Sequence, residues 1–248
     1  MSAATDPAAG ATSGSSPGGA LPERRGIVYR HPWIFFAVLG VVLLTLMRVA
    51  CGSGKELGDL PVLGAVPEFT FTDQHGKAFG TKDVAGKPWI ASFFFTSCRT
   101  ECPAIMEANK KVALALDKAG ARPDEVLMVS FSVDPEFDTP AVLGSYALDQ
   151  GISSPRWHLV TGARKDLEAV IVGRSEKSSA GVVQYGFATA WGDRQQHTGG
   201  FVDIAHSMKL VLVDGRAGIR HYFSATDPKD LELIATHALQ LAREEGKP

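Results

Sequence analysis

The sequence predicts one α/β domain, and three apolar runs are the main reason. Trp89–Thr96 and Val126–Val133 contain too few polar residues to have a solvent face, which is typical of central strands covered on both sides of a sheet. His206–Val213 is a third strong strand. Helical patterns separate these runs, and such alternation predicts helices layered on a sheet. With 45% hydrophobic residues, the 248-residue chain can bury a sizeable core.

The first half of the domain begins with a short predicted strand. Apolar and polar residues alternate over Phe69–Thr72, and the turn sequence of residues 73–76 follows. After the first buried strand, apolar residues recur at helical spacing from Pro103 to Ala119. Gly120 then predicts the end of an amphipathic helix.

The second half contains a long stretch without a regular pattern. Thr139-Pro140 is a good start for a helix over Ala141–Gln150, because proline is tolerated in the first helical turn. Residues 174–203 are predicted to be an extended loop or hairpin inserted before the last two strands. The other predicted elements are the strands Trp157–Val160 and Ile219–Phe223 and the helices Lys165–Val172 and Pro228–Arg243. The order β-α-β-α-β-β-α, with two cysteines opening the first main helix, is the thioredoxin-like arrangement, expected over residues 67–245.

Three segments precede this domain. Residues 1–31 begin with small residues and proline, which bury too little apolar surface to fold, so they are predicted to be a disordered cytoplasmic tail. Residues 32–51 are nearly all apolar and about as long as a membrane-spanning helix, with Arg48 near the end. Arginines before this span predict a single-pass anchor in the cytoplasmic (inner) membrane, with the main domain on the periplasmic, extracytoplasmic side. Residues 52–66 are predicted to be a tether.

Two alternatives to the anchor stay open. The apolar segment also fits a signal peptide that is removed. Cys51 could be a lipidation site, although Arg48 stands where an apolar residue is expected before such a cysteine. Under all three interpretations, the same domain is exported across the membrane.

Overall composition limits the classes of partner. The formal net charge of −2 is no signature of a polyanion-binding surface, so nucleic acid is not an expected partner. Three cysteines are too few for a disulfide scaffold, and Cys51 is far in sequence from the close pair Cys98 and Cys102.

Cys98 and Cys102 are four positions apart at a predicted strand-to-helix turn. If both lie in the first helical turn, their Cβ atoms are about 5–6 Å apart, whereas a relaxed disulfide needs about 3.5–4.5 Å. A metal that binds two sulfurs at about 2.3 Å each holds them about 4 Å apart. The spacing therefore favours a metal over dithiol exchange, provided that Cys98 is helical. The helix N-terminus and Arg99 are both expected to favour the thiolate.

Two thiolates need at least one further ligand. Tetrahedral zinc takes four, whereas soft thiolates with one imidazole suit Cu(I). Among the seven histidines, His206 is the natural candidate, because it is predicted to begin a strand directly after the excursion. Strand ends in open α/β sheets face the functional crevice.

Each of these features also has a plainer interpretation. Two cysteines of an exported domain can form a structural or redox disulfide, and a single histidine is more often a hydrogen-bonded structural residue. Met106 and Met208 could supply a thioether but have the spacing of core residues. Asp134 before Pro135 can merely cap a turn. The histidines interpreted as structural are His75, His158, His197, His221 and His237.

Four motifs follow one another through the domain: Phe95–Pro103, Ser132–Pro140, Trp157–Gly162, and His206-Ser207 leading into Leu210–Asp214. Cys-x3-Cys-Pro with a downstream His-Ser is specific in combination. Over roughly Val66–Glu245, together with the single N-terminal anchor, the chain resembles the Sco (SenC) copper chaperones of cytochrome c oxidase assembly.

The resemblance implies a thioredoxin-like fold that binds one copper ion, as Cu(I), Cu(II) or both, through Cys98, Cys102 and His206. Asp134 and Arg99 are predicted to lie next to these ligands. The family implies action outside the cytoplasmic membrane, where copper is delivered to the dinuclear copper site of cytochrome c oxidase subunit II or to another copper acceptor. Some members are thought instead to reduce the cysteines of that site.

Three features depart from the family pattern. Arg99 stands where proline is usual, Ala205 stands where aspartate usually precedes the histidine, and the excursion over residues 174–203 is longer than expected. Loss of the acidic neighbour is expected to loosen the orientation of His206.

Two other functions remain open. In an exported thiol-disulfide oxidoreductase, Cys98 would attack and Cys102 would resolve, although the usual redox spacing is one residue shorter. In a peroxidase of the peroxiredoxin type, the attacking cysteine needs a threonine three residues before it, whereas Thr96 is two residues before Cys98.

Overall fold

The structure is a computed structural model that describes residues 32–51, 61–178, 181–197 and 202–246. The predicted disordered tail, residues 1–31, lies outside the described residues.

Two compact units make up the chain, residues 1–54 and 55–248. In the first unit, helix α1 (Pro32–Cys51) coincides with the predicted anchor segment. None of the helices in the described part of the chain has the length and apolarity needed to cross a membrane.

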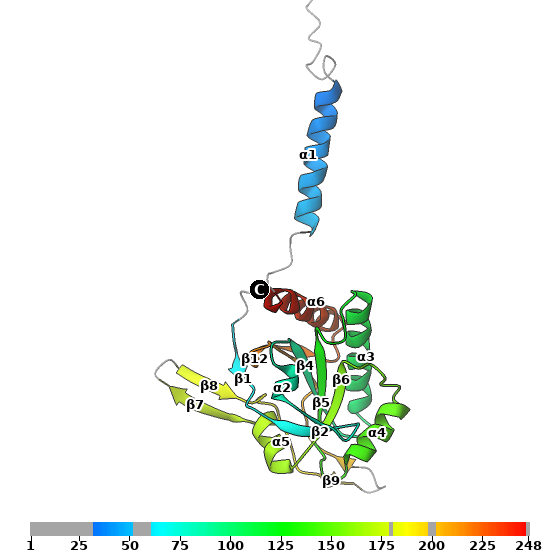
Figure 1. The fold of residues 1–248 in the computed structure, drawn as a ribbon, viewed down its shortest axis with the longest axis vertical. Helices are drawn as coiled ribbons and strands as arrows, with labels where there is room; N and C mark the ends of the chain where they lie inside the picture. The colour runs from blue at the N-terminus through cyan, green and yellow to red at the C-terminus, as the bar shows by residue number, and fades with distance from the viewer. Residues whose placement is uncertain (1–31, 52–60, 179–180, 198–201, 247–248) are drawn as a thin grey trace, which may run out of the picture. The chain divides into compact units, whose positions relative to one another are not determined.

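The second unit is built on a ten-stranded sheet with the order β3-β2-β6-β5-β4-β11-β12-β1-β8-β7 (Figure 1). β4, β5 and β6 are parallel, and β11 joins β4 in the antiparallel direction. β9 and β10 form a separate pair. The strands are β1 (Gly64–Ala65), β2 (Thr70–Asp73), β3 (Ala78–Gly80), β4 (Trp89–Phe94), β5 (Leu127–Ser132), β6 (Trp157–Thr161), β7 (Arg174–Ser178), β8 (Gly181–Tyr185), β9 (Gln195–Gln196), β10 (Val202–Asp203), β11 (Lys209–Val213) and β12 (Gly218–Ser224).

Helices pack against this sheet and against one another. α3 contacts α6 and β4, α4 contacts β6 and β2, and α6 also contacts β12. Capping follows the sequence signals: the Thr139 side chain accepts a hydrogen bond from the Val142 N–H, and Gly120 ends the α3 segment with a φ of 78°. The helices of this unit are α2 (Thr81–Val84), α3 (Cys102–Lys118), α4 (Pro140–Asp149), α5 (Arg164–Ile171) and α6 (Pro228–Glu245).

The predicted mixed α/β fold is confirmed, and its central strands are buried for the expected reason. Every residue of β4 and of β5 is buried, as the continuous apolar runs predicted. Phe131 of β5 lies among the rings of Phe69, Phe93 and Phe187, with centroid distances of 5.5, 6.1 and 5.5 Å. This aromatic packing fixes the strand ends from which the cysteine turn and the β5–α4 loop emerge.

The described part of the excursion contains the hairpin that the sequence predicted as one of its two alternatives. β7 and β8 pair in the antiparallel direction, and this hairpin joins the main sheet through β1. β1 lies within the range predicted to be a tether, of which residues 52–60 are outside the described part. β1, β3 and α2 were not predicted, because elements of two to four residues are too short to show a period.

The strand predicted to begin at His206 begins three residues later, at Lys209. The ladder between β11 and β12 starts with the pair Lys209 and Ser224, so residues 206–208 lie outside this ladder. His206 instead forms an isolated antiparallel bridge with Trp191 in the excursion.

Candidate metal centre

Cys98 lies in the turn that connects β4 to α3, outside the helix. Its backbone N–H donates to the Phe95 carbonyl at 3.3 Å, and its thiol is partly buried. α3 begins at Cys102, because Pro103 fits the first helical turn, where no backbone N–H is required. The argument that helical spacing disfavours a disulfide therefore does not apply to this pair.

Cys102 is fully buried at the start of α3. Its sulfur accepts a hydrogen bond from the Phe95 N–H at 3.5 Å, and its own N–H donates to the Cys98 sulfur at 3.3 Å. Amide groups at the N-terminus of a helix stabilise negative charge, so this contact favours a thiolate at Cys98.

His206 is half-buried in the segment between β10 and β11. Its Nε2 atom is 3.3 Å from the Cys102 sulfur, and its ring meets the Phe95 ring edge-on, with centroids 5.7 Å apart. Nδ1 is 3.4 Å from the Ser207 carbonyl oxygen, so each ring nitrogen of His206 lies close to a potential acceptor of the imidazole proton.

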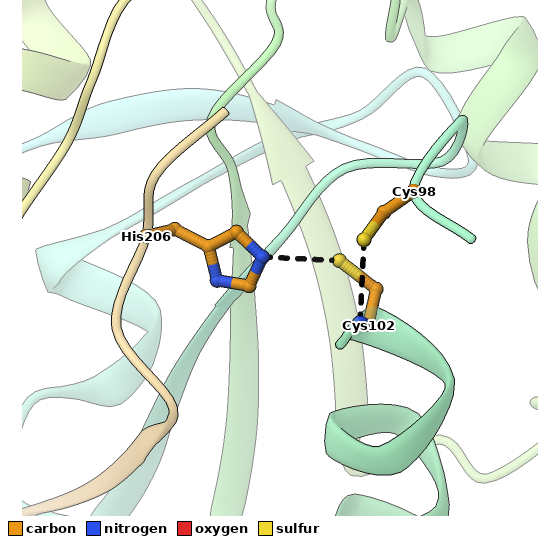
Figure 2. Close-up of side chains that lie close together, drawn as sticks. All are labelled: Cys98, Cys102 and His206. Carbon is orange, nitrogen blue, oxygen red and sulfur yellow. Dashed lines mark hydrogen bonds between the residues drawn. The ribbon is translucent and has the colours of Figure 1, made fainter. Parts of the chain in front are cut away.

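The structure thus brings together all three residues that the sequence nominated as metal ligands. Their donor atoms lie within 4.8 Å of one another. Figure 2 shows Cys98 on its turn, Cys102 on the first turn of α3, and the His206 imidazole pointing toward the Cys102 sulfur from a different segment. Two sulfurs and one imidazole form a soft three-donor group, which fits Cu(I) better than tetrahedral zinc.

The two thiols have opposite acidities. A hydrogen bond from Cys102 lowers the pKa of Cys98 to about 3, with further hydrogen bonds from His206 and from backbone N–H groups acting the same way. The same thiol–thiol hydrogen bond, together with burial, raises the pKa of Cys102. Before any metal binds, Cys98 is therefore the thiolate and Cys102 is the thiol that donates to it.

Asp138 is a buried residue that the sequence reasoning did not assign to this region. Its carboxylate accepts hydrogen bonds from the Thr96 N–H at 3.1 Å, from the Ser132 hydroxyl at 2.6 Å, and from the Thr96 hydroxyl. Burial raises the pKa of the Asp138 carboxyl despite these bonds. A signal existed, because Asp138 follows β5, the parallel neighbour of β4, and the ends of adjacent parallel strands share one sheet edge.

Asp134 and Arg99 were predicted to neighbour the ligands. Asp134 is buried, and its carboxylate forms an ion pair with Arg194 of the excursion. Arg99 is exposed, and the pKa of Cys98 is lowered chiefly by hydrogen bonds instead. The sequence offered no signal for Arg194, because the excursion lacks any regular pattern.

The residues interpreted as structural stay apart from this donor group in the described part of the chain. His158 lies 3.6 Å from the Asp73 carboxylate and stacks on Phe79, with ring centroids 4.1 Å apart. Met106 is fully buried in the core.

Fold and site together define a thioredoxin-like domain that carries a Cys-Cys-His group. The model of the SCO1/SenC family matches residues 63–240, more than half of the chain, and the chain belongs to this family.

Individual relatives agree with this assignment. The chain is 36% identical over 120 residues to an SCO1 protein homolog of Bacillus subtilis, covering 48% of this chain and 60% of the relative. It is 27% identical over 157 residues to the mitochondrial SCO1 homolog of Homo sapiens, covering 60% of this chain and 50% of the relative. The matches therefore span about half to three fifths of these curated relatives.

Solved structures show the same fold. A SCO1/SenC family lipoprotein from Bacillus anthracis is 27% identical with a TM-score of 0.58, over 73% of this chain and 97% of that chain. ScoI of Bradyrhizobium japonicum, whose structure has copper bound, is 24% identical with a TM-score of 0.56, over 71% of this chain and 98% of that chain.

Proposed function

We propose that this protein binds one copper ion through Cys98, Cys102 and His206 and delivers it to the dinuclear copper site of cytochrome c oxidase subunit II. The convergence of two sulfurs and one imidazole within 4.8 Å carries the proposal. Membership of the SCO1/SenC family supports it, as do the relatives whose structures have copper bound.

Delivery by ligand exchange requires that an acceptor reach the copper. Cys98 lies on a turn and is partly buried, and His206 is half-buried on an irregular segment, whereas Cys102 is fully buried. An incoming thiolate would therefore displace Cys98 or His206 first, and Cys102 would release the ion last.

Copper titration of the purified full-length chain tests this function. We expect the wild type to bind one equivalent, and the double variant Cys98→Ala/Cys102→Ala to lose this binding, because only the imidazole remains. Cys51→Ala is the matched control and is expected to bind like the wild type.

Copper should then pass from the loaded protein to the copper-free soluble domain of subunit II. A wild type that binds no copper, or that keeps it in the presence of the acceptor, would contradict the proposal.

A thiol-disulfide oxidoreductase is the second candidate, and the low pKa of Cys98 favours it. The Cys98 thiolate would attack a disulfide of the partner and release one partner thiolate. Cys102, after losing its proton, would attack the mixed disulfide, so the partner leaves as a dithiol and Cys98–Cys102 becomes oxidised. Reductase turnover that survives His206→Ala with copper excluded would favour this reading, since the reaction needs only the two thiols.

We also propose that residues 32–51 anchor the protein in the cytoplasmic membrane, with the copper site on the outer side. The support for this proposal comes from the sequence alone: residues 32–51 are nearly all apolar and arginines precede them, although no helix in the described part of the chain has the length and apolarity needed to cross a membrane. The full chain should remain in the membrane pellet after carbonate extraction, and a chain without residues 1–51 should become soluble. A mature protein that begins after residue 51 would instead indicate a cleaved signal, and a mass shift abolished by Cys51→Ser would indicate lipidation.

A further inference from the structure

The segment that carries His206 depends on a second segment for its position. His206 lies outside regular strands, and its neighbour Ala205 accepts a hydrogen bond from the Gly192 N–H at 2.8 Å. Trp191 forms the isolated bridge with His206. A Cβ atom on Gly192 would come within 3.0 Å of the Ala205 Cβ, so the two segments pack closely at this point.

The Trp191–Arg194 segment is in turn attached to the β5–α4 loop. The Trp191 Nε1–H donates to the Val133 carbonyl at 2.8 Å. Arg194 forms an ion pair with the buried Asp134 carboxylate, and its guanidinium lies 5.5 Å from the centroid of the Phe137 ring. Three contacts from one short segment therefore reach one loop.

The same loop also holds the cysteine side of the site. Asp138 at its end accepts hydrogen bonds from the backbone and hydroxyl of Thr96, two residues before Cys98. The β5–α4 loop is thus bonded to the turn that carries one sulfur and to the segment that supports the imidazole. The conformation of the β5–α4 loop therefore affects the distance between His206 and the two cysteines.

We propose that Arg194 is a positioning residue for the metal site: its ion pair with Asp134 holds the Trp191–Arg194 segment, and this segment holds His206 against the cysteines. The proposal rests on the copper function proposed above. Asp134 is nearly inaccessible to solvent, so loss of the guanidinium would leave a buried carboxylate without its cationic partner. The segment would then move to let water reach Asp134, and the His206 support would loosen.

Hydrogen exchange in the metal-free full-length chain tests the positioning directly. We expect Arg194→Gln to increase the exchange rate of the Gly192 amide about tenfold or more, because its bond to Ala205 opens when the segment is released. Arg194→Lys keeps the charge but not the fork geometry and should restore part of the protection. Arg174→Gln is the matched control, since Arg174 pairs with the exposed Glu176 in the same excursion.

Copper binding by the same variants gives the second readout. Arg194→Gln should weaken copper affinity about tenfold with the cysteines and His206 intact, and Arg174→Gln should leave it unchanged. A double-mutant cycle tests the pair itself. The double variant Arg194→Gln/Asp134→Asn should lose much less copper-binding free energy than the sum of the losses in the two single variants.

The outcomes separate this inference from the copper function. A wild type that binds no copper refutes the function, while the exchange rates still decide whether Arg194 holds the segment. If the wild type binds copper and Arg194→Gln keeps both the exchange rate of Gly192 and the copper affinity, the positioning role is wrong. The positioning role is also wrong if Arg194→Gln raises the exchange rate of the Gly192 amide but leaves the copper affinity unchanged. Should Arg194→Gln fail to fold, the same comparisons with Arg194→Lys decide.

Discussion

Replacement of His206 by alanine is expected to weaken Cu(I) binding at least about hundredfold. Loss of an outer contact to a metal ligand typically costs 10- to 100-fold in affinity, and loss of a ligand should cost no less. In this protein the two sulfurs are already adjacent, and His206 Nε2 at 3.3 Å from the Cys102 sulfur is the remaining donor of the group. Competition against a chelator of known affinity measures the change.

Binding of Cu(II) should be weakened by His206→Ala even more than binding of Cu(I). Imidazole nitrogen is a preferred ligand of Cu(II), so the thiolate-to-copper absorption band of the wild type should be lost in His206→Ala. His75→Ala is the control, because His75 is exposed in the turn between β2 and β3. Equal affinity and an unchanged spectrum in His206→Ala would show that the three-ligand site is wrong.

Cys98 is expected to react with iodoacetamide at a rate that hardly changes between pH 5 and pH 9. Hydrogen bonds from Cys102 and His206 lower the pKa of Cys98 to about 3, so the thiol is already deprotonated throughout this range. An ordinary cysteine with a pKa of about 8.5 gains roughly 10³-fold in thiolate over the same range. Its rate rises accordingly, whereas that of Cys98 stays level.

The absolute rates should cross as the pH rises. A thiolate of lower pKa is a weaker nucleophile, so Cys98 should react faster than a model thiol at pH 5 and more slowly at pH 9. Cys102→Ala removes the donor with the largest effect and should shift the titration of Cys98 upward. Mass-spectrometric peptide mapping separates Cys98 from Cys51 and Cys102. A rate that climbs through pH 8–9 in the wild type would rule out the low pKa.

Much of the fold followed from local sequence signals. β4 and β5 were predicted because both faces of these strands are buried, which requires uninterrupted apolar residues. α4 was predicted from Thr139-Pro140, and Thr139 does cap its first turn. Such signals lie within a few neighbouring residues and need no knowledge of the rest of the chain.

The geometry of the cysteine pair was predicted less well, although the sequence contained the clue. The spacing argument held only if both cysteines lay on one helix, whereas α3 starts at Cys102. Pro103 is best accommodated in the first helical turn, which excludes Cys98 from the helix. Because Cys98 lies outside the helix, its sulfur can accept a hydrogen bond from the Cys102 N–H.

Contacts between irregular segments could not be predicted. Asp134 and Arg194 are 60 positions apart, and neither belongs to a periodic pattern that would indicate a shared face. Their pairing depends on where the β5–α4 loop and the excursion cross in space. The candidate ligands Cys98, Cys102 and His206 could be nominated from soft-metal chemistry and family resemblance, but the contacts around them required the structure.

The two-residue strand β1 has a consequence for proteolytic release of the domain. β1 lies between β12 and β8, and Leu63 N–H and Val66 N–H donate to the Ile219 and Ala217 carbonyls at 2.8 Å. A protease that cut before residue 61 would liberate a domain with its sheet complete. A cut after Ala65 would remove β1, convert β12 into an exposed edge open to pairing with other chains, and detach the β7–β8 hairpin from the main sheet. Residues 61–66 are thus part of the architecture of the domain, and the site of cleavage would decide whether a released form exposes the edge of β12.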